Sequence, residues 1–537
     1  MTTYQAYFSK TDHKRILPPS WGHGPFPAKL EQNLALLDPN HMITMGSGTP
    51  NKDFFSVKNI TVNHSIDLHY QKDAKDSHIN SFYIGEKVKQ SDVQKADSKI
   101  EELFEYADNT FGSYSTIDLV KKLTKKFEIF KDYKSNNFSE EDYDYCVTSG
   151  TSASSYYLCQ LLLDDTKTIL VEELTFTVIL GNVSMTGANV VPFNVNLNGN
   201  DENGENPIDT KYLENLLKNW STIHPKKPFP SVFYTIPVQN PTGLVQKIQH
   251  KREIYDILKK YKILVMEDDP YGYLTLTDDL KSNCDFNDKA SFESQKQIYF
   301  SALKKTGSYL SIDTEGLVIR CESFSKIFGT GLRLGFIIGP KQIIDRVKNY
   351  IECSTREISG LSMTVFNQCC QGMDKLLCQN LKTNDIEQLD GWVQWCINLC
   401  VLHRHKQKVF YKELTENPVY ASKRLFTCIK PTFGMFLFIG LNLNEFKSEA
   451  LKSPQALTEA MQYMDYKLLE NNLDAIIGTR LIVDINHSFK KSGFIRVTTS
   501  QIKNDKELAE AARRICTSIE QFFDEYLTKK QPYPVLL

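Results

Sequence analysis

Residues 323–333, with the sequence SFSKIFGTGLR, place a single lysine in surroundings that do not suit a charged side chain. Lys326 stands three residues after Ser323 and seven before Arg333, among glycines, hydroxyl residues and apolar residues. An ammonium group in such a setting is costly unless it is neutralised, paired or covalently modified, and lysines with a lowered pKa are typical of Schiff-base chemistry. Arg333 adds a planar donor suited to a phosphate. A surface lysine whose apolar stem is covered is the competing interpretation.

Polar side chains follow three other apolar runs. Thr151 and Ser152 open a predicted helix after YDYCVTSG, Asn240 follows SVFYTIP, and Asp268 ends ILVMEDD. Backbone N–H groups at a helix N-terminus, with hydroxyls beside them, can bind an anion, although a plain helix cap also explains Thr151 and Ser152. A turn also explains Asn240, and a cap or a solvated turn also explains Asp268. A carboxylate that ends a buried strand needs a cationic or N–H partner.

Short apolar runs alternate with helical patterns from about residue 85 to about residue 350. The runs are predicted strands at 143–150, 168–173, 189–195, 231–237, 263–269, 316–324 and 333–340. They are apolar throughout rather than alternating, as expected when helices cover both faces of a sheet. The predicted fold class is therefore α/β, with a large doubly wound, mostly parallel sheet. Because the carboxyl ends of parallel strands meet at one edge, we expect the candidate residues to gather there.

The chain has 537 residues, which is long enough for two or three domains. We predict an N-terminal arm with part of a small domain at 1–84, a large domain at 85–350, and a C-terminal small α+β domain at 351–537. Residues 275–315 have little periodicity and are predicted to form a long excursion from the strand–helix alternation.

Composition and charge argue against several classes of function. The net charge of −2 and the pI of about 6.6 leave no basic surface typical of nucleic-acid or anionic-membrane binding. The 12 cysteines include no C-x-x-C pair, so a zinc site or other metal site is not expected. The N-terminus has no apolar signal segment, and no run approaches the roughly 18 apolar residues that cross a bilayer. We therefore predict a cytoplasmic protein with reduced thiols.

The order and spacing of these groups resemble the fold-type I, class I/II aminotransferases, which depend on pyridoxal phosphate. Within that family the chain looks most like the fungal aromatic aminotransferases and the kynurenine/2-aminoadipate aminotransferases. The resemblance covers nearly the whole chain. Matching stretches include VEELTFT at 171–177, QNPTG at 239–243, MEDDPYGYL at 266–274 and PTFGMFLFI at 431–439. The large domain would then bind the cofactor.

The resemblance implies a set of cofactor contacts. Lys326 would form a Schiff base with pyridoxal phosphate and later move a proton between the substrate Cα and the cofactor C4′. Asp268 would pair with the pyridine nitrogen and so make the ring an electron sink. The other implied contacts are Asn240 and Tyr271 at the 3′-oxygen, Phe176 on the ring face, and Thr151, Ser152, Ser323 and Arg333 at the phosphate. Tyr106 is similar to a tyrosine that reaches the phosphate from a partner subunit, which implies a homodimer.

The resemblance also implies a substrate site and a reaction. Arg496, in GFIRVTT, matches the arginine that binds the α-carboxylate, with Asn240 beside it. Arg15 and Gly48 match N-terminal elements that close over the substrate side chain. The implied reaction is ping-pong transfer of an amine from an aromatic amino acid, kynurenine or 2-aminoadipate to a 2-oxo acid, expected to be 2-oxoglutarate. Arg15 is expected to serve both aromatic and acidic side chains.

Three other functions fit parts of the same pattern. A pyridoxal-phosphate lyase or cyclising synthase shares Lys326 and Asp268, so the motifs do not separate it from an aminotransferase. Ser323-x-x-Lys326 also fits the S-x-x-K of serine β-lactamases, but KTG at 305–307 precedes it and no S-D-N occurs. A transcription regulator with an aminotransferase-like domain would carry a basic helix-turn-helix module, which the N-terminus lacks. The lyase or synthase stays open as the alternative.

Overall fold

The computed structural model describes most of the chain. The described residues are 4–10, 27, 30, 32, 55–68, 70, 79–85, 101–104, 106, 110–130, 139–199, 205–281, 288–444 and 449–528. Two of the predicted site residues, Arg15 and Gly48, lie outside them. Within the described part of the chain, no helix is both long enough and apolar enough to cross a membrane.

A seven-stranded sheet forms the centre of the molecule, in the order β3-β9-β8-β7-β6-β4-β5. Its strands are β3 Tyr143–Thr148, β4 Thr168–Glu172, β5 Asn189–Phe193, β6 Val232–Thr235, β7 Leu264–Asp268, β8 Val318–Ser323 and β9 Gly335–Pro340. Only β9 runs antiparallel to its neighbours. Every residue of β7, β8 and β9 is buried, which explains why the strand sequences do not alternate. The predicted α/β class with a mostly parallel sheet is confirmed.

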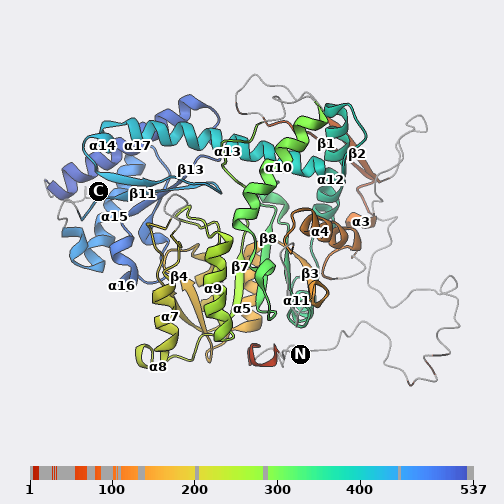
Figure 1. Ribbon diagram of the computed structural model, residues 1–537, viewed down its shortest axis with the longest axis horizontal. Helices are drawn as coiled ribbons and strands as arrows, with labels where there is room; N and C mark the ends of the chain where they lie inside the picture. Colours follow the sequence, from red (N-terminus) through yellow and green to blue (C-terminus); the bar gives the residue numbers. More distant parts are fainter. Residues whose placement is uncertain are drawn as a thin grey trace.

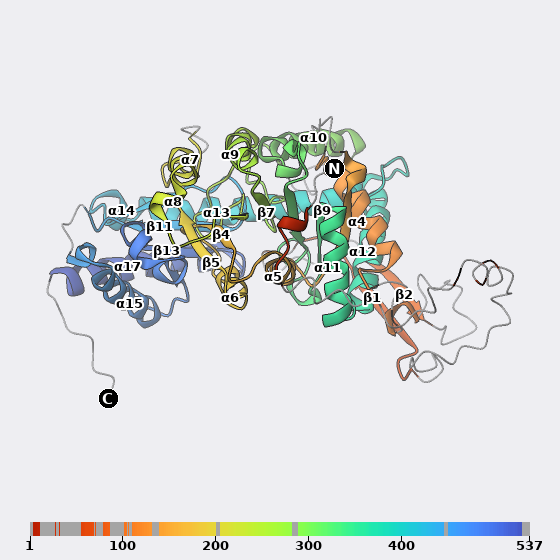
Figure 2. The same cartoon turned by 90° about the horizontal axis from the view of Figure 1, so that it is seen from below.

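Helices cover both faces of this sheet. Figure 2 shows α9 and α10 on one side, and α5, α6 and α11 on the other. Their bounds are α5 Thr151–Leu162, α6 Val178–Ser184, α9 Ile248–Lys260, α10 Lys289–Thr306 and α11 Lys341–Ser354. The other helices that precede the C-terminal sheet are α3 Glu101–Phe104, α4 Tyr114–Lys126, α7 Thr210–Lys218, α8 Trp220–Ile223, α12 Gly360–Leu381, α13 Asp390–Glu416 and α14 Pro418–Ala421.

Residues 275–315 were predicted to form a long excursion from the strand–helix alternation. That prediction was wrong for residues 289–306, which form helix α10. The helix begins at Asp288, whose side chain accepts a hydrogen bond from the Ser291 amide. Its buried face includes Gln295, Lys296 and Thr306 as well as aromatic residues. Because polar residues occupy that face, the apolar spacing that identifies a helix is weak there.

A second, four-stranded antiparallel sheet lies toward the C-terminus, in the order β10-β11-β13-β12. Its strands are β10 Phe426–Ile429, β11 Phe436–Leu441, β12 Ile476–Ile477 and β13 Phe494–Thr498. The helices of this region are α15 Pro454–Glu470, α16 Ile485–Ser488 and α17 Asp505–Gln521. A separate hairpin, β1 Asn59–His64 and β2 Asn80–Gly85, packs on α12.

Helix α13 connects the two main parts of the molecule. Figure 1 shows it running from α14 and α17 on the left toward α12 and α10 on the right. Trp392 and Cys396, near its start, belong to the core around the seven-stranded sheet, whereas Phe410 and Leu414 belong to the C-terminal core. The predicted domain boundaries at 84 and 350 stay predictions.

Candidate active site

A cavity of about 640 Å³ lies between the carboxyl edge of the large sheet, α13 and the C-terminal sheet. Ten of the predicted site residues line it: Thr151, Ser152, Phe176, Asn240, Asp268, Tyr271, Ser323, Lys326, Arg333 and Arg496. Tyr106 is not among the lining residues, and its side chain is 62% exposed. The structure therefore brings together residues spread over more than 300 positions of the sequence, and leaves Tyr106 facing outward.

Lys326 lies in the turn that follows β8, and the turn is anchored from two sides. The indole N–H of Trp395, on α13, donates to the Ile327 carbonyl oxygen at 2.6 Å. The buried Phe324 ring lies 4.0 Å from the Phe366 ring, centroid to centroid. Burial lowers the pKa of Lys326, and the nearby guanidinium groups of the cavity lower it further. A larger fraction of the amine is therefore neutral and nucleophilic.

An anion site surrounds the start of α5. Gly150 is the N-cap residue, with a φ of 96° and no capping side chain. A Cβ at this position would lie 3.3 Å from both Arg333 Nη2 and Ser323 Oγ, so glycine keeps the space beside the helix start open. The Thr151 and Ser152 amides open the helix, where backbone N–H groups and the helix dipole favour a negative charge.

Arg333 completes this anion site. Its Nη2 donates to the Ser149 carbonyl oxygen at 2.9 Å, and its Nη1 donates to Ser325 Oγ at 3.1 Å. These acceptors are neutral, and no carboxylate of the described residues pairs with the guanidinium. Arg333 also adopts a φ of 50°, a left-handed conformation that non-glycine residues adopt rarely. An uncompensated guanidinium held in a strained backbone conformation is consistent with a phosphate-binding role.

Asp268 ends β7 with its two carboxylate oxygens in different surroundings. The Tyr234 hydroxyl donates to Oδ2 at 2.6 Å. Oδ1 is buried and has no hydrogen-bond partner among the described residues. Burial raises the pKa of Asp268 to about 6, and the charge of Asp269 adds to the shift, whereas the Tyr234 hydrogen bond opposes it. The free oxygen is suited to a cationic N–H donor bound in the cavity.

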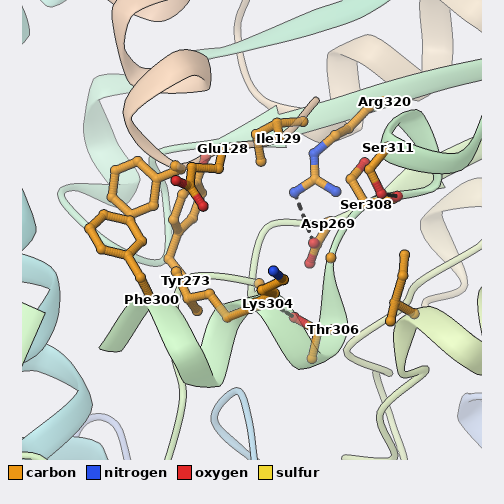
Figure 3. A pocket seen from close by; sticks show the side chains of 15 residues that line it. Glu128, Ile129, Asp269, Tyr273, Phe300, Lys304, Thr306, Ser308, Ser311 and Arg320 are labelled. Carbon is orange, nitrogen blue, oxygen red and sulfur yellow. Dashed lines mark hydrogen bonds and ion pairs between the residues drawn. The ribbon is translucent and has the colours of Figure 1, made fainter. Parts of the chain in front are cut away.

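A buried ionic network fixes the strand ends behind Asp268. Arg320, on β8, lies 3.0 Å from Glu267, 2.9 Å from Asp269 and 2.6 Å from Glu322. Figure 3 shows Arg320 and Asp269 pointing toward each other beside a small separate cavity of about 60 Å³. All four side chains are almost completely buried. Arg320 thus ties β7 to β8 on both sides of Asp268 and holds that carboxylate in place.

Arg496 reaches the cavity from the C-terminal sheet, on β13 opposite Phe438 of β11. Its Nη1 donates to Asn240 Oδ1 at 2.7 Å, and its guanidinium lies 4.6 Å from the centroid of the Phe436 ring. No carboxylate of the described residues forms an ion pair with it. Two neutral groups therefore orient the arginine, while its charge stays available for a carboxylate ligand.

Comparison with known proteins identifies the family. The model of the aminotransferase class I and II family matches residues 83–515, which is most of the chain. The chain belongs to this family. It is 31% identical over 494 residues to aromatic amino acid aminotransferase 2 of Saccharomyces cerevisiae, covering 90% of this chain and 91% of that protein. The crystal structure of an aromatic aminotransferase from C. albicans superposes with a TM-score of 0.76 at 28% identity, covering 97% and 98% of the two chains.

A further relative, the mitochondrial kynurenine/alpha-aminoadipate aminotransferase of Bos taurus, is 31% identical over 228 residues, or 42% of this chain and 46% of that protein. The predicted class of enzyme, a transaminase that depends on pyridoxal 5′-phosphate, is confirmed. The cavity of this aminotransferase fits that cofactor. The free Asp268 oxygen suits a protonated ring nitrogen, the anion site at Gly150 and Arg333 suits a phosphate, and the Lys326 amine suits an aldehyde.

Four further residues of the site were missed by sequence reasoning, namely Tyr234, Ser325, His403 and Lys406. Ser325 could have been found, since it lies between Ser323 and Lys326. Tyr234 stands in the apolar run of β6 and looked like a core residue. His403 and Lys406 lie three residues apart on α13, in the basic stretch HRHKQK, which is typical of an exposed helix face.

Proposed function

We propose that this aminotransferase moves the amino group of an aromatic amino acid to a 2-oxo acid, with 2-oxoglutarate as the acceptor. The single observation that carries the proposal is one cavity that combines Lys326, the free Asp268 oxygen and the unpaired Arg496. The names of the relatives support aromatic donors, with kynurenine and 2-aminoadipate as related candidates. Apolar and aromatic side chains, among them Leu399, Met435 and Phe436, also line the cavity and suit an aromatic ring.

Each protein group has a distinct part in the proposed reaction. When bound, pyridoxal phosphate supplies an electron sink that stabilises the charge left when a proton leaves the substrate Cα. Asp268 would keep the ring nitrogen protonated, Asn240 and Tyr271 would contact the 3′-oxygen, and Phe176 would pack on the ring face. Arg496 binds the α-carboxylate and so orients the Cα–H bond. Lys326 would accept the Cα proton and carry it toward C4′, a role that its lowered pKa favours.

The phosphate contacts fix the cofactor against Lys326. Ser323 and Arg333, together with the Thr151 and Ser152 amides and hydroxyls, would hold the phosphate dianion at the start of α5. Arg15 and Gly48 lie outside the described residues, and their contacts with the substrate side chain stay predictions.

Absorbance spectroscopy with a panel of amino donors tests the proposal. The holoenzyme is expected to absorb near the visible edge, to lose this band with phenylalanine, tyrosine, tryptophan, kynurenine or 2-aminoadipate, and to regain it with 2-oxoglutarate. The Lys326→Ala variant is expected to lack the band, and its retention would refute the assignment of the lysine. Release of ammonia or of a cyclised product in place of a 2-oxo acid would favour the alternative, a lyase or cyclising synthase.

We also propose that the enzyme is a homodimer in which Tyr106 contacts the phosphate of the partner subunit's cofactor. In its own chain Tyr106 is exposed, and the Arg356 guanidinium lies over its ring, with 5.7 Å between the guanidinium carbon and the ring centroid. Light scattering should give twice the chain mass, and Tyr106→Phe should weaken cofactor binding without changing that mass. We also propose that the enzyme is cytoplasmic, and fractionation of cells would test this, since some relatives are named as mitochondrial.

A further inference from the structure

Four lysines in the described part of the chain are buried, and one of them has different partners from the others. Three form ion pairs: Lys251 with Glu267 at 3.1 Å, Lys296 with Asp390 at 2.9 Å, and Lys467 with Glu525 at 2.5 Å. The fourth, Lys406, is 5% exposed and has no carboxylate of the described residues within ion-pair distance. Its Nζ donates to the neutral Ser500 carbonyl oxygen at 3.0 Å. A buried ammonium without a counter-charge is costly, so its surroundings need an explanation.

Lys406 lines the active-site cavity from α13. The Tyr70 ring covers it on one side, with 4.9 Å between Nζ and the ring centroid. His403, one helical turn earlier on the same face, is also buried, and its Nδ1 has no partner among the described residues. Burial and the charge of Lys406 together lower the pKa of His403 to about 4, so the imidazole is neutral at pH 7. This end of the cavity therefore presents one cation and one neutral imidazole.

The proposed chemistry leaves Lys406 without an ion-pair partner among the described residues. Arg333 would be matched by the cofactor phosphate and Arg496 by the substrate α-carboxylate, and Lys326 would carry no charge once it has reacted with the cofactor aldehyde. Lys406 is the remaining cation on the cavity wall in the described part of the chain. Two carboxylates on one substrate would satisfy both Arg496 and Lys406, and about 640 Å³ is within the usual range for small-molecule sites.

We infer that Lys406, with His403 beside it, binds the second carboxylate of dicarboxylic substrates. The ligand class comprises acidic amino acids and the corresponding 2-oxo dicarboxylic acids. This inference rests on the proposed function, because it assigns the acceptor side of the same site. Burial lowers the pKa of Lys406, and the more distant charge of Glu507 opposes this shift only in part. A carboxylate bound beside Nζ would stabilise the ammonium form further.

The same wall also accepts an aromatic side chain. Leu399 and Leu402 line the cavity on the α13 face that carries Lys406, and Met435 lines it from the end of the C-terminal sheet. The four-carbon stem of Lys406 adds apolar surface. An aromatic ring therefore packs on this wall without using the ammonium, whereas a dicarboxylate uses it. One cavity can thus alternate between the two substrate classes required by a ping-pong reaction.

Binding of unreactive acids to the holoenzyme tests the inference without turnover. The probes are glutarate, which has two carboxylates, and 3-phenylpropionate, which has one, and the readout is the shift of the cofactor absorbance on titration. We expect Lys406→Met to raise the Kd for glutarate by about 10- to 100-fold, as for the loss of one charge-assisted hydrogen bond. The Kd for 3-phenylpropionate should change less than about twofold by the same reasoning, and Lys406→Arg should keep most of the glutarate affinity.

Matched variants separate this role from others. Lys408→Met removes a lysine on the same helix whose side chain is 77% exposed, and it should leave both affinities unchanged. If Lys406→Met does not fold, Lys406→Gln replaces it.

Equal weakening of the binding of both acids would refute the inference in favour of a purely structural role, through Ser500 and Tyr70. Unchanged glutarate binding, with a loss in Arg15→Ala instead, would refute it in favour of the N-terminal arginine. A holoenzyme that reacts with no aromatic amino acid would refute the proposed donor class instead, and this outcome is independent of the glutarate titration.

Discussion

Asp268→Asn tests the account of the buried carboxylate, since the structure predicts opposite effects on stability and on cofactor binding. Burial raises the pKa of Asp268 from 3.8 to about 6. A difference of about 2 pKa units corresponds to about 3 kcal/mol. Because the raised pKa disfavours the carboxylate in the folded state, the native protein binds more protons than the unfolded chain between these two values. Without cofactor, the stability contributed by this group therefore falls as pH rises from about 4 to about 6.

The magnitude can be compared at two pH values. Asp268 lowers the free energy of unfolding of the cofactor-free protein by about 1 kcal/mol at pH 4.5 and by about 3 kcal/mol at pH 7. Between pH 4.5 and pH 7, the free energy of unfolding of the cofactor-free wild type should therefore fall by about 2 kcal/mol relative to that of Asp268→Asn. This change corresponds to a fall of roughly 4 °C in the thermal midpoint of a large domain. Asparagine can still accept the Tyr234 hydrogen bond, so this difference isolates the charge. Cofactor affinity should change in the opposite sense, because the variant cannot pair with a protonated ring nitrogen.

Thermal unfolding of the cofactor-free proteins at pH 4.5 and pH 7 is the assay, together with titration of each with pyridoxal phosphate. Asp256→Asn, which removes an exposed carboxylate on α9, is the matched control and should follow the wild type. A midpoint difference between wild type and Asp268→Asn that stays constant with pH, or that changes in the opposite direction, would show that Asp268 is not destabilised by burial. Tighter cofactor binding by the variant would contradict its pairing with the ring nitrogen.

Three further substitutions test other parts of the site. Arg320→Met should destabilise the protein by about 3–5 kcal/mol, because it removes the guanidinium shared by three buried carboxylates and leaves Glu267 with Lys251 as its remaining cation. A thermal midpoint equal to that of the exposed-site control Lys304→Met would contradict this. Tyr234→Phe should weaken cofactor binding about tenfold by removing the hydrogen bond to Asp268, measured by spectral titration; unchanged affinity would argue against that contact. Arg496→Gln should raise KM for every amino donor by about 10- to 100-fold and leave cofactor affinity unaltered, whereas an effect on only one donor would contradict binding of the shared α-carboxylate.

Much of the site could be predicted because the carboxyl ends of parallel strands meet at one edge of a sheet, so residues at these ends come together. Asp268 ends one strand of the same sheet, and Thr151, Asn240 and Lys326 each follow another, so their shared place at its carboxyl edge results from the topology. Arg496 lies on a different sheet, and only the resemblance to a known family connected it with the others.

The residues that sequence reasoning missed depend on contacts with no local signal. Lys406 stands among basic residues on α13, and its burial results from Tyr70 and from the segment after β13, which are distant in sequence. Tyr234 has its hydroxyl on Asp268 only because β6 and β7 are neighbours in the sheet. Helix α10 was missed because polar residues on its inner face pair within the fold, so the apolar pattern is weak.

Helix α13 also constrains how this enzyme can change over evolutionary time. Trp395 anchors the lysine turn near the start of the helix, and Lys406 stands eleven residues later on the same rigid element. Because each residue of an α-helix advances the direction of the side chains by about 100°, one residue inserted between these positions would rotate Lys406 out of the cavity and leave Trp395 in place. Point substitutions at 403 and 406 can therefore tune the choice of acceptor, whereas insertions and deletions in this stretch of α13 would remove it while sparing the chemistry at Lys326.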